Sequence, residues 1–150
     1  MRILAVDPGT TQSGWVLFED GKVVSAGVAQ NETVLQQIAA DHTADMLAVE
    51  MVASYGMAVG KEVFETVRWV GRFEQRWKDT HEQCDFRLVY RMEVKMHLCH
   101  NPKAKDANIR QALIDMLGAP GTKKEPGGTY GVKSHAWPAL AVAVTAAQTC

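Results

Sequence analysis

Short apolar runs separated by turn residues dominate the first thirty positions and predict strands. Residues 2–6 form a mainly apolar run that stops at an Asp-Pro-Gly turn, 7–9, which is typical of a buried strand entering a turn. Residues 14–18 and 22–29 favour strands, and the Asp-Gly pair at 20–21 between them is a strong hairpin signal. The pattern therefore predicts that the chain opens with three antiparallel strands.

Helical spacing of apolar residues begins after the third predicted strand. Residues 32–41 carry one apolar face, and residues 46–49 are again a short apolar run, which ends at Glu50. A strand reached through a helical crossover is expected to run parallel to the first strand. Residues 58–79 show apolar positions every three or four residues, which predicts a long amphipathic helix, and 86–90 are a fifth strand.

The last third of the chain is mainly helical. We expect a short helix at 93–99, a helix at 106–117 that ends at Gly118, and a small apolar helix at 136–147. Residues 118–134 are rich in Gly, Pro and Lys and predict a loop. The order predicts one α/β domain, in which a mixed sheet of three antiparallel and two crossover strands is flanked by helices.

Composition agrees with a single globular domain. The chain has 150 residues, of which 47% are hydrophobic and 22% are charged, so it can build a core without disulfides or metal. It contains neither a stretch of 18 apolar residues nor an apolar signal-peptide region at the N-terminus. Cys84, Cys99 and Cys150 form no CxxC pair, so we expect free thiols in a reducing cytoplasm.

Charge is distributed unevenly along the chain. Residues 1–66 contain 3 Lys or Arg and 9 Asp or Glu, a net charge of −6, whereas residues 67–150 contain 13 and 8, a net charge of +5. An acidic site beside a basic, nucleic-acid-binding surface would give this distribution, and so would ordinary solvated surface.

Two carboxylates follow strands that are expected to be neighbours. Asp7 ends the first predicted strand and Glu50 ends the fourth, so side-by-side pairing would bring them together. Hard cations such as Mg²⁺ are usually held by one or two carboxylates together with substrate phosphates. The alternative is a turn-forming Asp7 and a surface Glu50.

Several short motifs occur in an order that matches one protein family. The turn at 7–9, Gly14, the Leu-Ala-Val-Glu sequence that ends at Glu50, and the segment at 134–143 together resemble the RuvC family of Holliday-junction resolvases, in particular its bacteriophage-type members. The resemblance implies a ribonuclease H-like fold. It also implies a homodimer that cuts four-way DNA junctions with Mg²⁺ or Mn²⁺.

The resemblance assigns roles to individual residues. Asp7 and Glu50 match catalytic metal ligands of the family, and His135 matches a third metal-binding position. Three residues later the family usually has Asp, but this chain has Pro138, which implies that a second metal ion would bind only weakly. Asp106 is expected to cap the helix that follows it, with recruitment as a metal ligand as the alternative.

Basic and aromatic residues suggest a DNA surface. Lys95 and Lys105 match functional lysines of the family, and Lys95 is expected to assist catalysis by stabilising charge at the cut phosphodiester. Arg91 and Lys103 lie in the same basic stretch and are expected to bind phosphates with them. Tyr55, in a loop after Glu50, would stack on a base or simply pack.

Other functions remain open at this stage. The turn at 7–9 also resembles the phosphate loop of sugar kinases, actin and heat-shock chaperones, but those proteins need two such halves. A branched-DNA-binding protein with little or no activity and an RNA-processing nuclease of the same fold are closer alternatives. The helix at 58–79, with Trp69 and Trp77, is expected to serve the core or a dimer interface.

Overall fold

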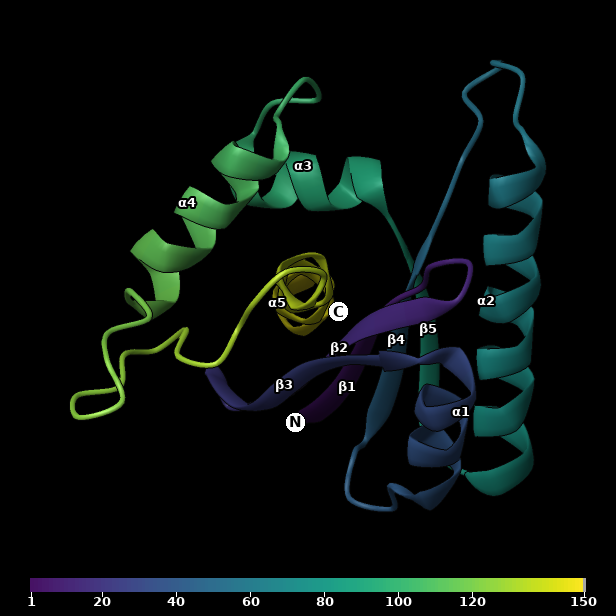
Figure 1. Cartoon of the computed structure of the whole chain (residues 1–150), viewed down its shortest axis with the longest axis horizontal. Coiled ribbons are helices and arrows are strands. Elements are labelled where there is room, and N and C mark those ends of the chain that lie inside the picture. Colours follow the sequence, from purple (N-terminus) through teal and green to yellow (C-terminus); the bar gives the residue numbers. More distant parts are fainter. Residues whose placement is uncertain (150) are drawn as a thin grey trace.

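Five strands form one mixed sheet in the order β3-β2-β1-β4-β5 (Figure 1). The computed structural model describes residues 1–149. The strands are β1 (Arg2–Asp7), β2 (Gln12–Glu19), β3 (Lys22–Gln30), β4 (Met46–Met51) and β5 (Asp85–Tyr90). The first three are antiparallel neighbours, while β4 is parallel to β1 and β5 is parallel to β4. The predicted sheet is confirmed.

Helices cover both faces of this sheet. They are α1 (Asn31–Ala40), α2 (Lys61–Thr80), α3 (Arg91–Cys99), α4 (Asp106–Leu117) and α5 (Ala136–Thr149). In Figure 1, α1 and α2 lie on one side of the sheet, and α5 lies between the other side and the α3–α4 pair. This arrangement buries α5 almost completely, which explains why its sequence is apolar on every face.

Two helix starts differ from the sequence prediction by two residues or more. The long helix begins at Lys61 rather than 58, because Gly60 is extended, with φ −95° and ψ −176°, and so Val59 lies outside the helix. Helix α3 begins at Arg91, directly after β5, rather than at 93. The side chain of Glu93 accepts a hydrogen bond from the Tyr90 N–H at 2.7 Å, which stabilises this earlier start.

Alternation along the strands divides the interior into two cores. Ile3 and Ala5 of β1 pack towards α5, while Leu4 and Val6 pack towards α1 and α2. Since side chains alternate along a strand, the next residue, Asp7, belongs to the α5 side. The sheet therefore aims the end of β1 towards the beginning of α5.

Helix α2 contributes one apolar face to the second core. Trp77 is fully buried, donates its indole N–H to the Asp85 carbonyl at 3.1 Å, and stacks on His81 with ring centroids 3.7 Å apart. Trp69 is half-buried against Phe73. Both tryptophans therefore serve packing, as expected.

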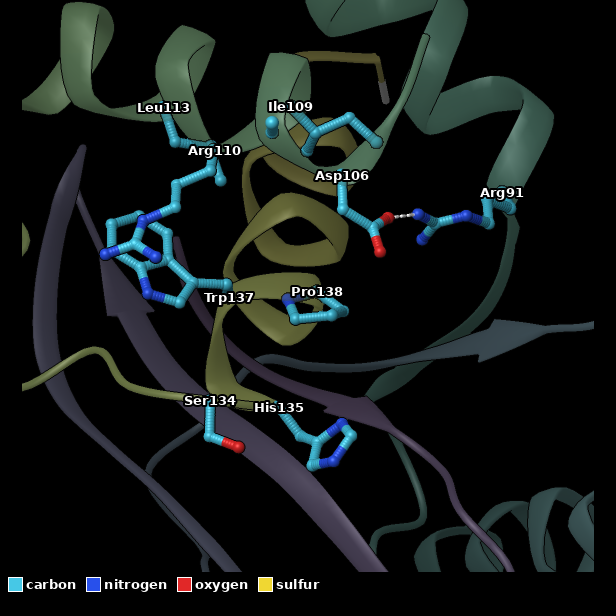
Figure 2. Close-up of a pocket in the computed structure, with 10 residues that line it drawn as sticks. Arg91, Asp106, Ile109, Arg110, Leu113, Ser134, His135, Trp137 and Pro138 are labelled. Carbon is cyan, nitrogen blue, oxygen red and sulfur yellow. Dashed lines mark hydrogen bonds and ion pairs between the residues drawn. The ribbon is translucent and has the colours of Figure 1, made fainter. Parts of the chain in front are cut away.

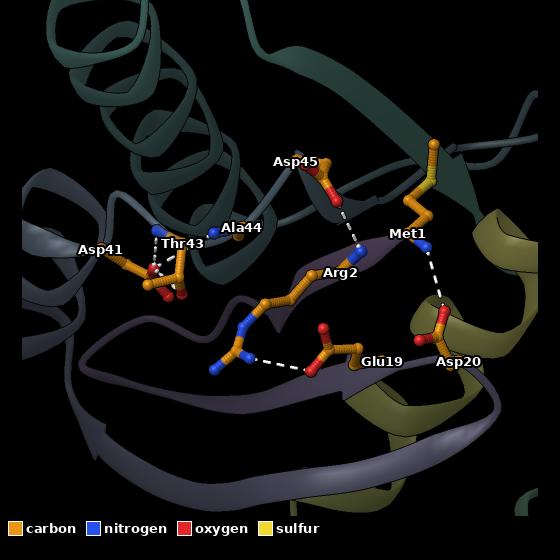
Figure 3. A network of polar contacts seen from close by, with 8 residues as sticks. All are labelled: Met1, Arg2, Glu19, Asp20, Asp41, Thr43, Ala44 and Asp45. Carbon is orange, nitrogen blue, oxygen red and sulfur yellow. Dashed lines mark hydrogen bonds and ion pairs between the residues drawn. The ribbon is translucent and has the colours of Figure 1, made fainter.

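A polar network holds the opposite end of the sheet (Figure 3). The Arg2 guanidinium donates to Glu19 at 2.8 Å, and the Arg2 backbone N–H donates to Asp45 at 2.7 Å. The N-terminal ammonium of Met1 donates to Asp20 at 3.1 Å. These contacts join β1 to the ends of β2 and β4 at the edge farthest from Asp7.

Free cysteines agree with the sequence prediction as far as the structure describes them. Cys84 and Cys99 are unpaired, and Cys150 lies outside the described residues. Within residues 1–149, none of the helices combines the length and apolar character needed to cross a membrane.

Candidate active site

Strand register places Asp7 beside Glu50. Val6 of β1 pairs with Val49 of β4, so the two carboxylates follow at adjacent positions where these parallel strands end. Alternation along both strands turns their side chains to the α5 side of the sheet. The predicted juxtaposition of the two acidic side chains is therefore present.

Burial and mutual repulsion hold protons on this carboxylate pair. Burial raises the pKa of Asp7 to about 6, although the Arg91 guanidinium acts in the opposite direction. Burial, and then the charge of Asp7, raise the pKa of Glu50 to about 8. The two carboxyl groups lie close enough together to share a proton. The Arg91 guanidinium offsets only part of the cost of ionising these two buried carboxylates together.

The pair fits a divalent metal ion. Its oxygen atoms are the ligands that Mg²⁺ and Mn²⁺ prefer, and a cation would remove the repulsion that raises both pKa values. Across residues 1–149, no three side chains of His, Cys, Asp or Glu are grouped closely enough to hold an ion. Asp7 and Glu50 would supply two ligands to such an ion, and His135 would have to approach them to supply a third.

Gly14 brings the His135 backbone to this site. Gly14 of β2 pairs with Asp7 of β1. A Cβ atom at position 14 would overlap the carbonyl oxygen of His135, so only glycine lets the chain cross the sheet here. His135 and the turn after β1 together line a groove of about 390 Å³. Its lining residues are Asp7, Pro8, Gly9, Thr10, Thr11, Gln12 and His135.

A buried polar network fixes the turn that follows Asp7. Ser13 donates to the Asn31 side-chain oxygen at 2.6 Å, and the Asn31 amide donates to the Gly9 carbonyl at 3.0 Å. The Gly9 N–H in turn donates to the Ser13 hydroxyl at 3.3 Å. Sequence reasoning missed these two positioning residues, because Ser13 and Asn31 lie 18 positions apart and no local motif joins them.

A second cavity, of about 450 Å³, lies on the other side of His135 (Figure 2). Helices α3, α4 and α5 form its walls with Arg91, Asp106, Ala107, Ile109, Arg110, Leu113, Ser134, His135, Trp137 and Pro138. Pro138 is the third residue of α5, where the missing N–H costs no helical hydrogen bond. The position thus lies in the first turn, as predicted, and it presents a ring without ligand atoms.

Arg91 bridges two acidic residues at the edge of this cavity. Its Nη1 lies 3.8 Å from Oε1 of Glu50, and its Nη2 contacts Oδ1 of Asp106, which Figure 2 shows pointing towards it. The expected capping role of Asp106 is wrong: Lys105 occupies the cap position, and its N–H is accepted by Asn108 at 2.9 Å. Sequence reasoning predicted Arg91 only as a phosphate-binding residue and did not foresee these two ion pairs.

The other predicted DNA-binding residues lie on α3, on the connection to α4 and in the loop after β4. Lys95 lies one helical turn beyond Arg91 on the same side of α3, and Lys103 and Lys105 lie in the connection to α4. None of the three lysines forms an ion pair within residues 1–149. Tyr55 follows β4, and it is 62% exposed. Its φ of +50° lies in the left-handed region.

Comparisons identify structures with this fold. No protein-family model and no curated protein matches the sequence. Among solved structures, Thermus thermophilus RuvC in complex with a Holliday junction substrate is similar, with 19% identity and a TM-score of 0.73. Another Thermus thermophilus RuvC structure gives 18% and 0.71. Each match covers 98% of this chain and 93% of the other. This chain therefore has the ribonuclease H-like fold of RuvC.

Proposed function

We propose that the chain is a metal-dependent endonuclease that cuts branched DNA, with the four-way junction as its substrate. The observation that carries this proposal is the buried Asp7–Glu50 pair at the ends of parallel strands, where two adjacent carboxylates could bind a divalent ion. The similar structure of RuvC was determined with a Holliday junction, which supports this substrate class.

The reaction is hydrolysis of a phosphodiester. Oxygen from water bonds to phosphorus, the bond from phosphorus to one bridging oxygen breaks, and that oxygen takes a proton. A divalent ion supplies an activated water and positive charge at the phosphate when it is bound. Asp7 and Glu50 would hold that ion with their carboxylates, and His135, just before α5, would complete the set by moving towards them. The buried network of Ser13 and Asn31 keeps the turn after Asp7 in place.

The unpaired lysines provide the DNA contacts. Lys95, Lys103 and Lys105 bind backbone phosphates, because lysines that form no ion pair within residues 1–149 are available to anions. Lys95 also stabilises charge at the cut phosphate. Tyr55 stacks on an unpaired base at the junction centre, for which its exposed ring is suited.

A homodimer fits this substrate, because a four-way junction has two symmetry-related strands to cut. Helix α2 is the proposed interface element. The face of α2 that points away from the sheet carries Phe64. This side chain is 60% exposed and belongs to neither core cluster.

A junction-binding protein without strong activity is the second candidate. Pro138 favours it, because this residue removes a ligand from the first turn of α5. It would retain the lysines and the fold while cleaving poorly. An RNA substrate is tested in the same assay.

The test is cleavage of end-labelled four-way junction, fork, duplex and RNA hairpin substrates in Mg²⁺ or Mn²⁺. We expect the junction to be cut and Asp7→Asn to abolish cutting while binding remains. Asp20→Asn is the matched control, because Asp20 lies at the other end of the sheet and its φ of +50° suits asparagine. Binding without cleavage in both metals would support the second candidate, and cutting by Asp7→Asn would overturn the site.

A further inference from the structure

Within the proposed function, we propose that Arg91 takes the place of a second metal ion, so that each chain works with one divalent ion and one fixed guanidinium. Two-metal nucleases use their two ions to stabilise both the attacking and the leaving oxygens. This chain would divide that task between the ion at Asp7 and Glu50 and the side chain of Arg91.

Three parallel strands deliver these groups to one edge of the sheet. Strand β1 ends in Asp7, and β4 carries Glu50 near its end. Strand β5 is followed at once by Arg91, and its last residue pairs with Met51 of β4. The guanidinium therefore starts from the strand next to Glu50, and its Nη1 lies 3.8 Å from that carboxylate.

The cavity that would hold a second ion has basic and apolar walls. Pro138 contributes a ring without ligand atoms, and the carboxylate of Asp106 is already occupied by Arg91. Arg110, the other cation in the wall, lies 4.6 Å from the Trp137 ring centroid and stacks there. The Arg91 guanidinium thus lines the cavity in which a second ion would need carboxylate ligands.

Asp106 acts as the positioning residue for Arg91. Its side chain is 84% exposed and reaches Arg91 from the start of α4, while Glu50 reaches it from the sheet. Held from both sides, the planar guanidinium keeps its remaining N–H groups for phosphate oxygens, which it can bind in a bidentate manner. An arginine stays charged at every working pH, so this half of the site needs no free ion.

The test measures Mn²⁺ binding and junction cleavage separately for Arg91→Gln. Mn²⁺ bound to DNA-free protein is counted by electron paramagnetic resonance, and cleavage is measured at saturating Mn²⁺. We expect one ion per chain in the unmodified protein. In Arg91→Gln we expect tighter Mn²⁺ binding, because Glu50 loses its competing cation, but a cleavage rate lower by about 10²-fold, typical for loss of one charge-stabilising donor.

Arg2→Gln is the matched control. Arg2 is also paired with a carboxylate, at 2.8 Å, but it lies at the opposite end of β1 (Figure 3). It should change neither measurement. The proposal is overturned if the unmodified protein binds two ions, if Arg91→Gln binds Mn²⁺ less tightly, or if it cleaves within twofold of the unmodified rate. Asp7→Asn distinguishes failure of the proposed function from failure of the role given to Arg91. Continued Mn²⁺ binding and cleavage in that variant would overturn the proposed function itself.

Discussion

The backbone of His135 crosses β2 directly over Gly14, so that a Cβ atom at Gly14 would overlap the His135 carbonyl oxygen. Gly14 is also the residue that pairs with Asp7. One missing methyl group therefore sets how closely the start of α5 approaches the carboxylates. Gly14, one of the motif residues noted in the sequence, is therefore needed because two backbone segments pack closely together here.

Gly14→Ala should displace the start of α5 and impair the site. We expect the free energy of unfolding to fall by about 1–3 kcal/mol, as for other overpacked positions, and Mn²⁺ binding to weaken. Urea unfolding and Mn²⁺ titration measure the two effects. Gly71→Ala is the control, because Gly71 lies in α2 with open space around it, and alanine there should leave stability equal or higher. Unchanged Mn²⁺ affinity in Gly14→Ala would contradict the role given to His135.

The carboxylate pair should make the metal-free protein less stable as pH rises. The folded-state pKa values of Asp7 and Glu50, about 6 and about 8, lie above the ordinary values of 3.8 and 4.5. Between pH 4 and 8 the folded chain therefore binds more protons than the unfolded chain, so this pair costs stability progressively across that range. Above about pH 8 both groups are ionised and the cost is complete.

Glu50→Gln should remove most of that cost. At pH 8 without metal, we expect the variant to be more stable than the unmodified protein by about 4 kcal/mol, and at pH 4 to be nearly equal. Thermal unfolding at both pH values measures the difference. Glu82→Gln is the control, because Glu82 is exposed, and it should show no such dependence. An equal effect of Glu50→Gln at pH 4 and pH 8 would contradict the coupling of the pair.

The sheet and its carboxylates could be predicted because short-range patterns determine them. The apolar runs that end at Asp7 and Glu50, with a helical segment between the strands, were enough to infer parallel neighbours. The helix that contains Trp77 was predicted in the same way; its end lies one residue from the prediction, but its start was wrong by three residues. Val59 fits the apolar spacing of the helix, but the extended backbone of Gly60 places it outside the helix.

The rest of the site depends on contacts that no local pattern records. The bridge from Arg91 to Glu50 and Asp106 requires knowing that β5 lies beside β4 and that α4 folds back over α3. The bond between Ser13 and Asn31 likewise depends on how β2 and α1 meet. Sequence reasoning could recognise the residue types but not which of them neutralise one another.

The unpaired lysines should control salt dependence of junction binding. Lys105→Ala and Lys95→Ala should each weaken binding and reduce the slope of log K against log salt by about 0.9, the value for one lost phosphate contact. Binding is measured by fluorescence anisotropy over a range of KCl, without divalent metal. Lys22→Ala, at the exposed hairpin between β2 and β3, should leave the slope unchanged. A slope that none of these changes alters would remove the lysines from the interface.

The proposed dimer should depend on the exposed side of α2. At micromolar concentration we expect a dimer by analytical ultracentrifugation, and Phe64→Asp should shift it towards monomer, since burying a charge at an interface is costly. Met116→Asp is the control, because Met116 is also exposed, at 46%, but lies on α4. A monomer for the unmodified chain would exclude the dimer, and a dimer that survives Phe64→Asp would move the interface elsewhere.

Adding a carboxylate at position 138 should change the number of Mn²⁺ ions that the site binds when Arg91 is absent. Pro138 and Arg91 line the same cavity, so an aspartate there would face either the guanidinium or, in its absence, a metal ion. Pro138→Asp alone should have a modest effect, because Arg91 neutralises the new charge. In Arg91→Gln, the same substitution should restore cleavage at millimolar Mn²⁺, with two ions bound per chain, because the new aspartate and Asp106, released from Arg91, then line one cavity. Cleavage rate against Mn²⁺ concentration is measured for the two single variants and the double variant.

Pro138→Ala in the same background is the control, since it removes the ring without adding a ligand and should restore nothing. If the double variant stays as slow as Arg91→Gln while binding a second ion, the guanidinium does more than replace a charge, and its geometry at the phosphate is what the reaction needs.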